Sequence, residues 1–217
     1  MGVFAFLAAR FNYPAVLDGS AEEVFPQLLA TGQLGRAVWA IYALLPLIWL
    51  PAGVGAYTAL RRVAPGTMLL ALQFAVIASI SMMLGLMRWP SIHWRLAEAY
   101  SVADPSQRAV LADLFDGINS YLGNYLGEFL GELSFSIFFL LSALAIRKSP
   151  LAPRWAAPIG LVTGAAGLIG MFRNVTSAVA IVASVNNYLL PTWMIILGVV
   201  MLRYLNPVES QPLRNNA

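Results

Sequence analysis

The chain has 217 residues, of which 59% are hydrophobic and 11% are charged, and it carries a formal net charge of +3. Soluble globular domains carry about 25% charged residues, so this composition excludes an ordinary soluble domain and indicates that much of the surface faces lipid. The twelve arginines and one lysine are spread along the chain, which argues against nucleic-acid binding, and the absence of cysteine excludes disulfides and cysteine metal sites.

The apolar segments predict a polytopic transmembrane helix bundle. A short apolar stub, Val3–Ala9, comes first, and we expect it to be the outer end of a first helix whose cytoplasmic half is missing. A bilayer core of about 30 Å needs roughly 20 apolar residues. Five segments meet this length, at about 38–60, 67–87, 121–146, 156–172 and 177–202. The fold class is therefore all-α, with 1–217 as a single membrane domain.

Two further features modify this bundle. Asp104-Pro105 is a typical start of a helix, and an apolar face follows it, so we interpret about 105–118 as an interfacial helix that precedes the third span. The last span is interrupted by Asn186, Asn187 and Pro191.

The charges of the loops predict the orientation. Loops 61–66 and 147–155 contain basic residues and no acidic residue, whereas 11–35 and 89–120 contain most of the acidic residues. Basic loops stay in the cytoplasm by the positive-inside rule. We therefore expect a multi-pass protein with 61–66, 147–155 and the C-terminus in the cytoplasm.

Glycines recur every fourth residue in the third span, at Gly123, Gly127 and Gly131. Small residues at this spacing let a neighbouring helix approach closely, and Gly160 and Gly164 in the fourth span have the same interpretation. This pattern predicts glycine-zipper packing between helices.

A polar stripe accompanies the glycines of the third span. It includes Glu128 and Glu132. Carboxylates inside a spanning helix almost never face lipid, and a rise of 1.5 Å per residue places both glutamates in the outer half of the bundle. Arginines and amides of other spans fall at a similar depth, which predicts an outer-side polar cluster that binds a ligand or locks the helices. Its candidate residues are Arg88, Asn124, Glu128, Glu132, Arg173, Asn174, Asn186 and Asn187. We expect at least one glutamate within ion-pair reach of Arg88 or Arg173.

Several chemistries are excluded. One histidine and no cysteine cannot build a di-iron, bis-histidine haem or zinc hydrolase site, so we expect no metal and no cofactor. We interpret the single histidine, His93, as an interfacial anchor among tryptophans. No nucleophile is recognisable beside the glutamates, and no catalytic residue is assigned.

Three stretches carry a resemblance to a known family. They are FNYPAVL at 11–17, the stretch from Arg88-Trp89 to Tyr100, and NSYLGNYLGEFLGE at 119–132. In these, and in the spacing of its helices, the chain resembles the bacterial family called domain of unknown function 4386. The resemblance implies a multi-helix protein of the bacterial inner membrane and implies no activity.

Three hypotheses for function remain open. The first is a non-enzymatic membrane protein with a binding, transport or accessory role. The second is an intramembrane enzyme that acts on a lipid or isoprenoid, with Glu128 or Glu132 as acid or base. The third is a structural subunit of a membrane complex. The expected partners are the lipid bilayer, a small-molecule or lipid ligand, and further copies of the chain or other membrane proteins.

Overall fold

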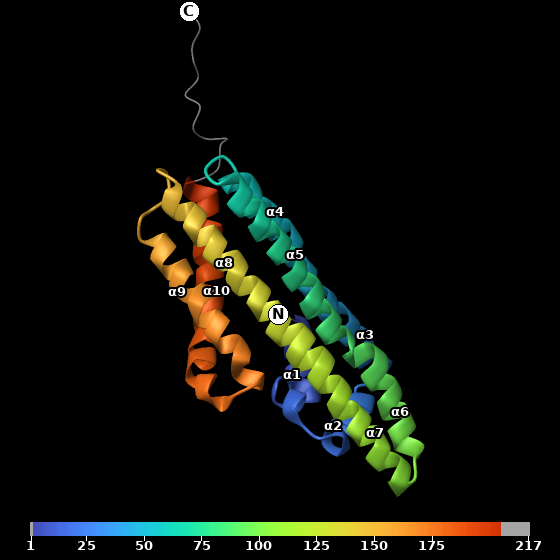
Figure 1. Cartoon of the computed structure of the whole chain (residues 1–217). Helices are drawn as coiled ribbons and strands as arrows, with labels where there is room; N and C mark the ends of the chain where they lie inside the picture. Colours follow the sequence, from blue (N-terminus) through green and yellow to red (C-terminus); the bar gives the residue numbers. More distant parts are fainter. Residues whose placement is uncertain (1, 205–217) are drawn as a thin grey trace, which may run out of the picture. The chain divides into compact units, whose positions relative to one another are not determined.

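The computed structural model describes residues 2–204 (Figure 1), and these residues form helices and no strand. Five helical stretches are long and apolar enough to cross a membrane, which confirms the predicted all-α, multi-pass architecture. They are Gly32–Leu60, Pro65–Val102, Pro105–Lys148, Ala156–Asn174 and Ser177–Arg203.

The helices are longer than the sequence predicts. The second stretch has 38 residues and the third has 44, whereas roughly 20 residues cross the hydrocarbon core. The helix predicted over 105–118 has these bounds as α7 (Pro105–Ile118), and it continues without a break toward Lys148. Nothing between Ile118 and Tyr121 breaks a helix, which explains the continuity. Both long stretches therefore carry turns that lie outside the hydrocarbon core.

Two compact units make up the described chain, and each is considered separately. Unit 1 consists of residues up to Leu47 together with Ile80–Glu128. It contains α1 (Gly2–Phe11), α2 (Ala21–Ala30), α3 (Gly32–Leu44), α6 (Trp94–Val102), α7 and the end of α5 (Pro65–Met87). Unit 2 consists of Ile48–Ser79 and the residues from Phe129 on.

The core of unit 1 is aromatic. Trp39 and Trp89 stack with their ring centroids 5.0 Å apart, and Phe11 packs edge-on against both rings. All three side chains are 0% exposed. Each such pair contributes about 0.5–1.5 kcal/mol beyond the burial of its area. These contacts join α1, α3 and the turn after α5, and they fix the position of the neighbouring Arg88.

Unit 2 is built around α9 (Ala156–Gly170), which packs against both α8 (Gly131–Lys148) and α10 (Ala180–Tyr204). Glycines of α9 permit the close approach of both neighbouring helices. A Cβ at Gly160 would lie 2.4 Å from the Trp193 ring of α10, and one at Gly164 would lie 2.6 Å from Leu140 of α8. Helix α4 (Trp49–Leu60) contacts α8 through Trp49 and Phe135, whose ring centroids are 4.7 Å apart. Helix α10 continues through Pro191, so the expected interruption does not break it.

Candidate functional site

A pocket in unit 1 brings charged and polar groups together. Its volume is about 280 Å³, at the lower end of the range of small-molecule sites. Four polar side chains line it, together with glycines and apolar side chains. The lining residues are Tyr13, Leu17, Tyr42, Pro46, Met82, Gly85, Leu86, Arg88, Gly123, Gly127 and Glu128.

Arg88 is the most buried charged group of this pocket, at 6% exposed. Its Nε donates to Asn119 Oδ1 at 2.9 Å, its Nη1 donates to the carbonyl of Gly85, and its guanidinium carbon lies 5.1 Å from the centre of the Trp89 ring. A Cβ at Gly123 would lie 2.5 Å from Nη2 of Arg88. Glycine at 123 is therefore what leaves room for the arginine.

Two π-helical segments shape the pocket. Arg88 directly precedes the first, Trp89–His93, where the His93 amide donates to the Arg88 carbonyl five residues earlier at 2.8 Å. Pro90 cannot donate a backbone hydrogen bond, which accounts for the wider turn here. Glu128 lies in the second segment, Asn119–Leu130. Because π-helical turns are rare and are frequent at functional sites, the second segment, which supplies Gly123, Gly127 and Glu128 to the lining, draws attention to the pocket.

Backbone contact closes one wall of this pocket. A Cβ at Gly127 would lie 3.1 Å from the Cα of Gly85, and a Cβ at Gly85 would lie 2.6 Å from the Cα of Gly127. No side chain separates the two helices at this point, so any larger residue pushes them apart.

Two phenol groups complete the polar lining. The hydroxyl oxygens of Tyr13 and Tyr42 lie 2.9 Å apart. Burial raises the pKa of Tyr13 far above its usual range, and the hydrogen bond with Tyr42 and the negative charge of Glu128 act in the same direction, whereas Arg88 opposes them. Tyr13 is therefore a neutral phenol that can both donate and accept a hydrogen bond.

We expected His93 to be an interfacial anchor, and its side chain is buried inside unit 1 instead of being exposed. It is 0% exposed and packs against Trp89 and Phe115, with ring centroids 4.8 and 4.7 Å away. Within residues 2–204 neither ring nitrogen has a hydrogen-bond partner. The imidazole therefore packs inside the aromatic core of unit 1. The neighbouring tryptophans in the sequence did not indicate this burial.

A second polar group lies in unit 2. Nη1 of Arg173 is 2.7 Å from Oε2 of Glu132, and Nδ2 of Asn186 donates to Oε1 of Glu132 at 3.0 Å. The expected ion pair between a glutamate and Arg173 is thereby confirmed. Helix α9 makes room for these groups, since a Cβ at Gly170 would lie 3.3 Å from Glu132 and one at Gly167 would lie 2.1 Å from Ser136.

Comparison with known proteins identifies the family of the chain. The model of a family described as domain of unknown function (DUF4386) matches residues 1–204. The chain belongs to this family. No curated protein and no solved structure matches it.

The predicted polar residues of this DUF4386 protein fall into two sets, each within one unit. Arg88 and Glu128 line the pocket of unit 1, whereas Glu132, Arg173 and Asn186 form the cluster of unit 2. Asn187 is exposed, Asn124 and Asn174 are half-buried, and Gly131 is buried at the start of α8.

Three polar residues of the pocket region were missing from the predicted set, namely Tyr13, Tyr42 and Asn119. Tyr13 and Asn119 both lie in stretches that carry the family resemblance, which is a signal that could have identified them. Tyr42 lies in an apolar helix, and only its contact with Tyr13 reveals its role. Among the described residues no group of three or more histidine, aspartate or glutamate side chains could hold a metal ion.

Proposed function

We propose that this DUF4386 protein is a non-enzymatic membrane protein whose unit 1 pocket binds a small amphipathic molecule, or the polar part of a lipid. The observation that carries this proposal is the burial of Arg88 beside Glu128 and two phenol hydroxyls at the wall of a cavity. Burying a charged group in a membrane protein is expensive, and such groups usually mark a site.

The chemistry of the lining indicates the kind of ligand. Arg88 and Glu128 carry opposite charges, so the pair adds no net charge to the pocket. The phenols of Tyr13 and Tyr42 offer a donor and acceptors, and they suit a hydroxyl, carbonyl or zwitterionic group. Leu17, Leu86 and Met82 line the rest and suit a hydrocarbon portion. A volume of about 280 Å³ accommodates a small molecule or part of a lipid.

Binding is favoured over catalysis by what lines the pocket. Its eleven lining residues include one carboxylate, one guanidinium and two neutral or weakly acidic phenols, and no serine, threonine or histidine. General acid–base chemistry needs a partner group that activates a nucleophile or stabilises a leaving group. The lining holds no serine, threonine or histidine that would act as nucleophile or as acid–base partner to Glu128.

We also propose the orientation and location derived from the loop charges. Segments 61–66, 147–155 and 203–217 would lie in the cytoplasm, and the membrane would be the bacterial inner membrane. The alternation of basic and acidic loops supports this orientation. The unit 1 pocket would then belong to the outer half of the protein.

Native mass spectrometry of the full chain, followed by extraction and identification of retained small molecules and lipids, tests the binding proposal. Glu128→Gln and Tyr13→Phe are the test variants, because each alters a polar group of the pocket and preserves side-chain size. Tyr57→Phe is the matched control, since Tyr57 lies on α4 outside the pocket lining.

The expected result is a retained molecule in the wild type and in Tyr57→Phe, with at least a severalfold lower occupancy in both pocket variants. Loss of one hydrogen bond in a buried site costs about 1–3 kcal/mol, which corresponds to roughly a fivefold to hundredfold loss of affinity. If all four proteins retain the same molecules equally, the pocket is not the binding site and the proposal fails.

A further inference from the structure

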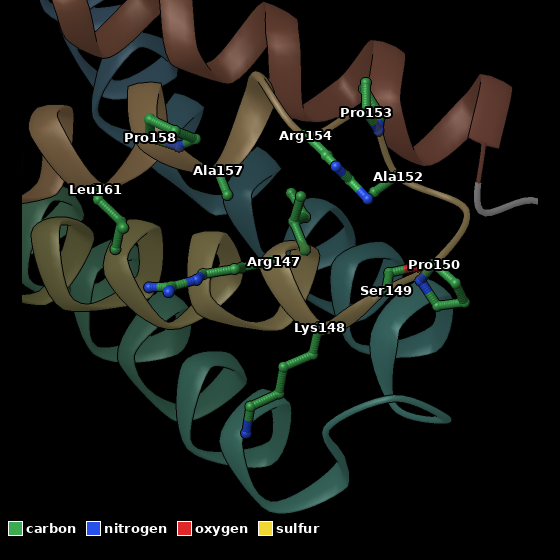
Figure 2. A pocket seen from close by; sticks show the side chains of 11 residues that line it. Arg147, Lys148, Ser149, Pro150, Ala152, Pro153, Arg154, Ala157, Pro158 and Leu161 are labelled. Carbon is green, nitrogen blue, oxygen red and sulfur yellow. The ribbon is translucent and has the colours of Figure 1, made fainter.

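A second and larger pocket lies in unit 2, at the connection between α8 and α9. Its volume is about 630 Å³. Arg147, Lys148 and Arg154 line it, and no acidic residue is among its eleven lining residues. Figure 2 shows Arg147 and Lys148 at the end of α8 and Arg154 on the loop that leads to α9. The lining of the pocket therefore carries three positive charges and no negative charge.

The loop that forms this pocket has a fixed shape. The Ser149 amide donates to the Ile146 carbonyl at 3.0 Å and ends α8, and the Ala156 amide donates to the Pro153 carbonyl at 3.1 Å where α9 begins. Pro150 and Pro153 restrict the backbone between these two points. The pocket is consequently preformed, and a ligand loses little affinity through ordering of the loop.

Exposed hydrophobic side chains lie on the loop that forms the pocket, and they suit the depth of the lipid headgroups. Trp155 is 55% exposed and Leu151 is 65% exposed, and both lie on the same short loop as Arg154. Tryptophan is enriched at the membrane interface, where its ring lies among the headgroups. The apolar helix α9 begins directly after Trp155, so the cations lie at the end of a stretch that is long and apolar enough to cross a membrane.

Simpler explanations account for only part of this arrangement. Arg147 and Lys148 lie in the last turn of α8, where positive charge favours the helix dipole. The positive-inside rule accounts for basic residues in such a loop but not for a cavity. Arg154 lies outside α8, and in Figure 2 its side chain extends from the loop toward Ala152.

The cations of this pocket also differ from two arginines elsewhere in the chain, which form ion pairs with glutamates. Arg173 pairs with Glu132 and Arg95 pairs with Glu98. For Arg147, Lys148 and Arg154, no ion pair with a carboxylate occurs within the described part of the chain. In addition, α9 begins without a side-chain cap, and Ala157 of its first turn lines the pocket, so the helix end favours a bound anion.

We propose that this pocket binds the phosphate of an anionic phospholipid headgroup. Basic pockets beside spanning helices suit lipid phosphates, and the exposed Trp155 and Leu151 provide contacts for the adjoining acyl chains. This inference is independent of the binding proposal for unit 1, because it concerns other residues and an anionic ligand.

The test uses the full chain in nanodiscs of phosphatidylcholine that contain a minor fraction of phosphatidylglycerol. Native mass spectrometry after release measures the ratio of the two lipids that stay bound. The test variant is Arg147→Gln/Arg154→Gln, and Arg154→Gln alone is the milder version. The matched control is Arg61→Gln/Arg62→Gln, which removes two exposed arginines at the end of α4, outside the pocket.

The wild type and the Arg61→Gln/Arg62→Gln control should retain phosphatidylglycerol preferentially. The Arg147→Gln/Arg154→Gln variant should show about a thirtyfold weaker preference, because it removes two basic residues that each contribute about 1 kcal/mol to the attraction of anionic lipid. Arg154→Gln should show an intermediate loss. Equal preference in all four proteins, or an equal loss in the two double variants, overturns the proposal.

A competition arm distinguishes a lipid phosphate from a free phosphate. Inorganic phosphate is added to the wild-type nanodiscs before the lipid ratio is measured. If the preference for phosphatidylglycerol persists, the lipid headgroup is the ligand. If inorganic phosphate abolishes the preference and adds its mass to the wild type but not to the Arg147→Gln/Arg154→Gln variant, the pocket is a phosphate site whose ligand is soluble.

Discussion

Replacing Glu132 by glutamine isolates the buried ion pair of unit 2. The carboxylate side chain is 7% exposed and pairs with Arg173 at 2.7 Å. Glutamine preserves the side-chain length and can still accept the hydrogen bond that Asn186 donates to Oε1. The substitution therefore removes the negative charge of residue 132 and with it the ion pair to Arg173.

The expected cost follows from the burial of the two partners. Removing one member of a buried pair costs about 3–5 kcal/mol, because the other charge stays buried without compensation. The Arg173 side chain is 31% exposed, so its guanidinium can shift toward the interface and recover part of that energy. We therefore expect the free energy of unfolding to fall by about 2–3 kcal/mol, which is below most of that range because the exposed part of Arg173 can be hydrated.

The assay is equilibrium unfolding of the full chain in mixed micelles of a mild detergent and dodecyl sulfate. A double-mutant cycle with Arg173→Gln measures the coupling, which should be at least about 1 kcal/mol for a direct buried contact. Glu98→Gln is the matched control, because Glu98 also pairs with an arginine, Arg95, at 3.1 Å but on an exposed surface. Exposed pairs contribute little to stability.

The reasoning fails if Glu132→Gln destabilises no more than Glu98→Gln. It also fails if the losses of Glu132→Gln and Arg173→Gln simply add in the double variant. A loss of binding without a loss of stability would instead assign the cluster a role in ligand recognition.

Three further predictions address packing, orientation and a helix start. Gly127→Leu should lower the melting temperature in detergent by an overpacking cost of about 1–3 kcal/mol or more, whereas Gly117→Ala, at a position with open space for a Cβ, should not; equal melting temperatures contradict the close helix contact. In intact cells a membrane-impermeant thiol reagent should label Val102→Cys and not Leu151→Cys, both at exposed positions, and the reverse pattern inverts the proposed orientation. Acidification should loosen the first turn of α7. The hydrogen bonds that the backbone amides of Gln107 and Ser106 donate to Asp104 lower the pKa of Asp104 below its usual value of 3.8. The stabilisation is present above pH 3.8 and disappears as the pH falls through the lower folded-state pKa. The protection of amides 106–108 from hydrogen exchange, relative to their intrinsic exchange rates, should therefore fall there in the wild type and show no such pH step in Asp104→Asn.

The sequence alone determined the architecture of the membrane-spanning helices. Their number and approximate positions follow from hydropathy, because a bilayer of fixed thickness demands a minimum apolar length. It also indicated that the glutamates of the third span need partners, and the pair between Glu132 and Arg173 confirms this. These inferences depend on local composition and on the physics of the solvent, which need no knowledge of the tertiary contacts.

The tertiary structure decided which polar groups meet. Glu128 and Glu132 are four residues apart and share one side of an ideal α-helix, yet Glu128 lines a pocket with Arg88 whereas Glu132 pairs with Arg173. Likewise, the contact between Tyr13 and Tyr42 joins residues 29 positions apart. No local pattern specifies such a contact, because it depends on how α1 and α3 pack around the buried tryptophans.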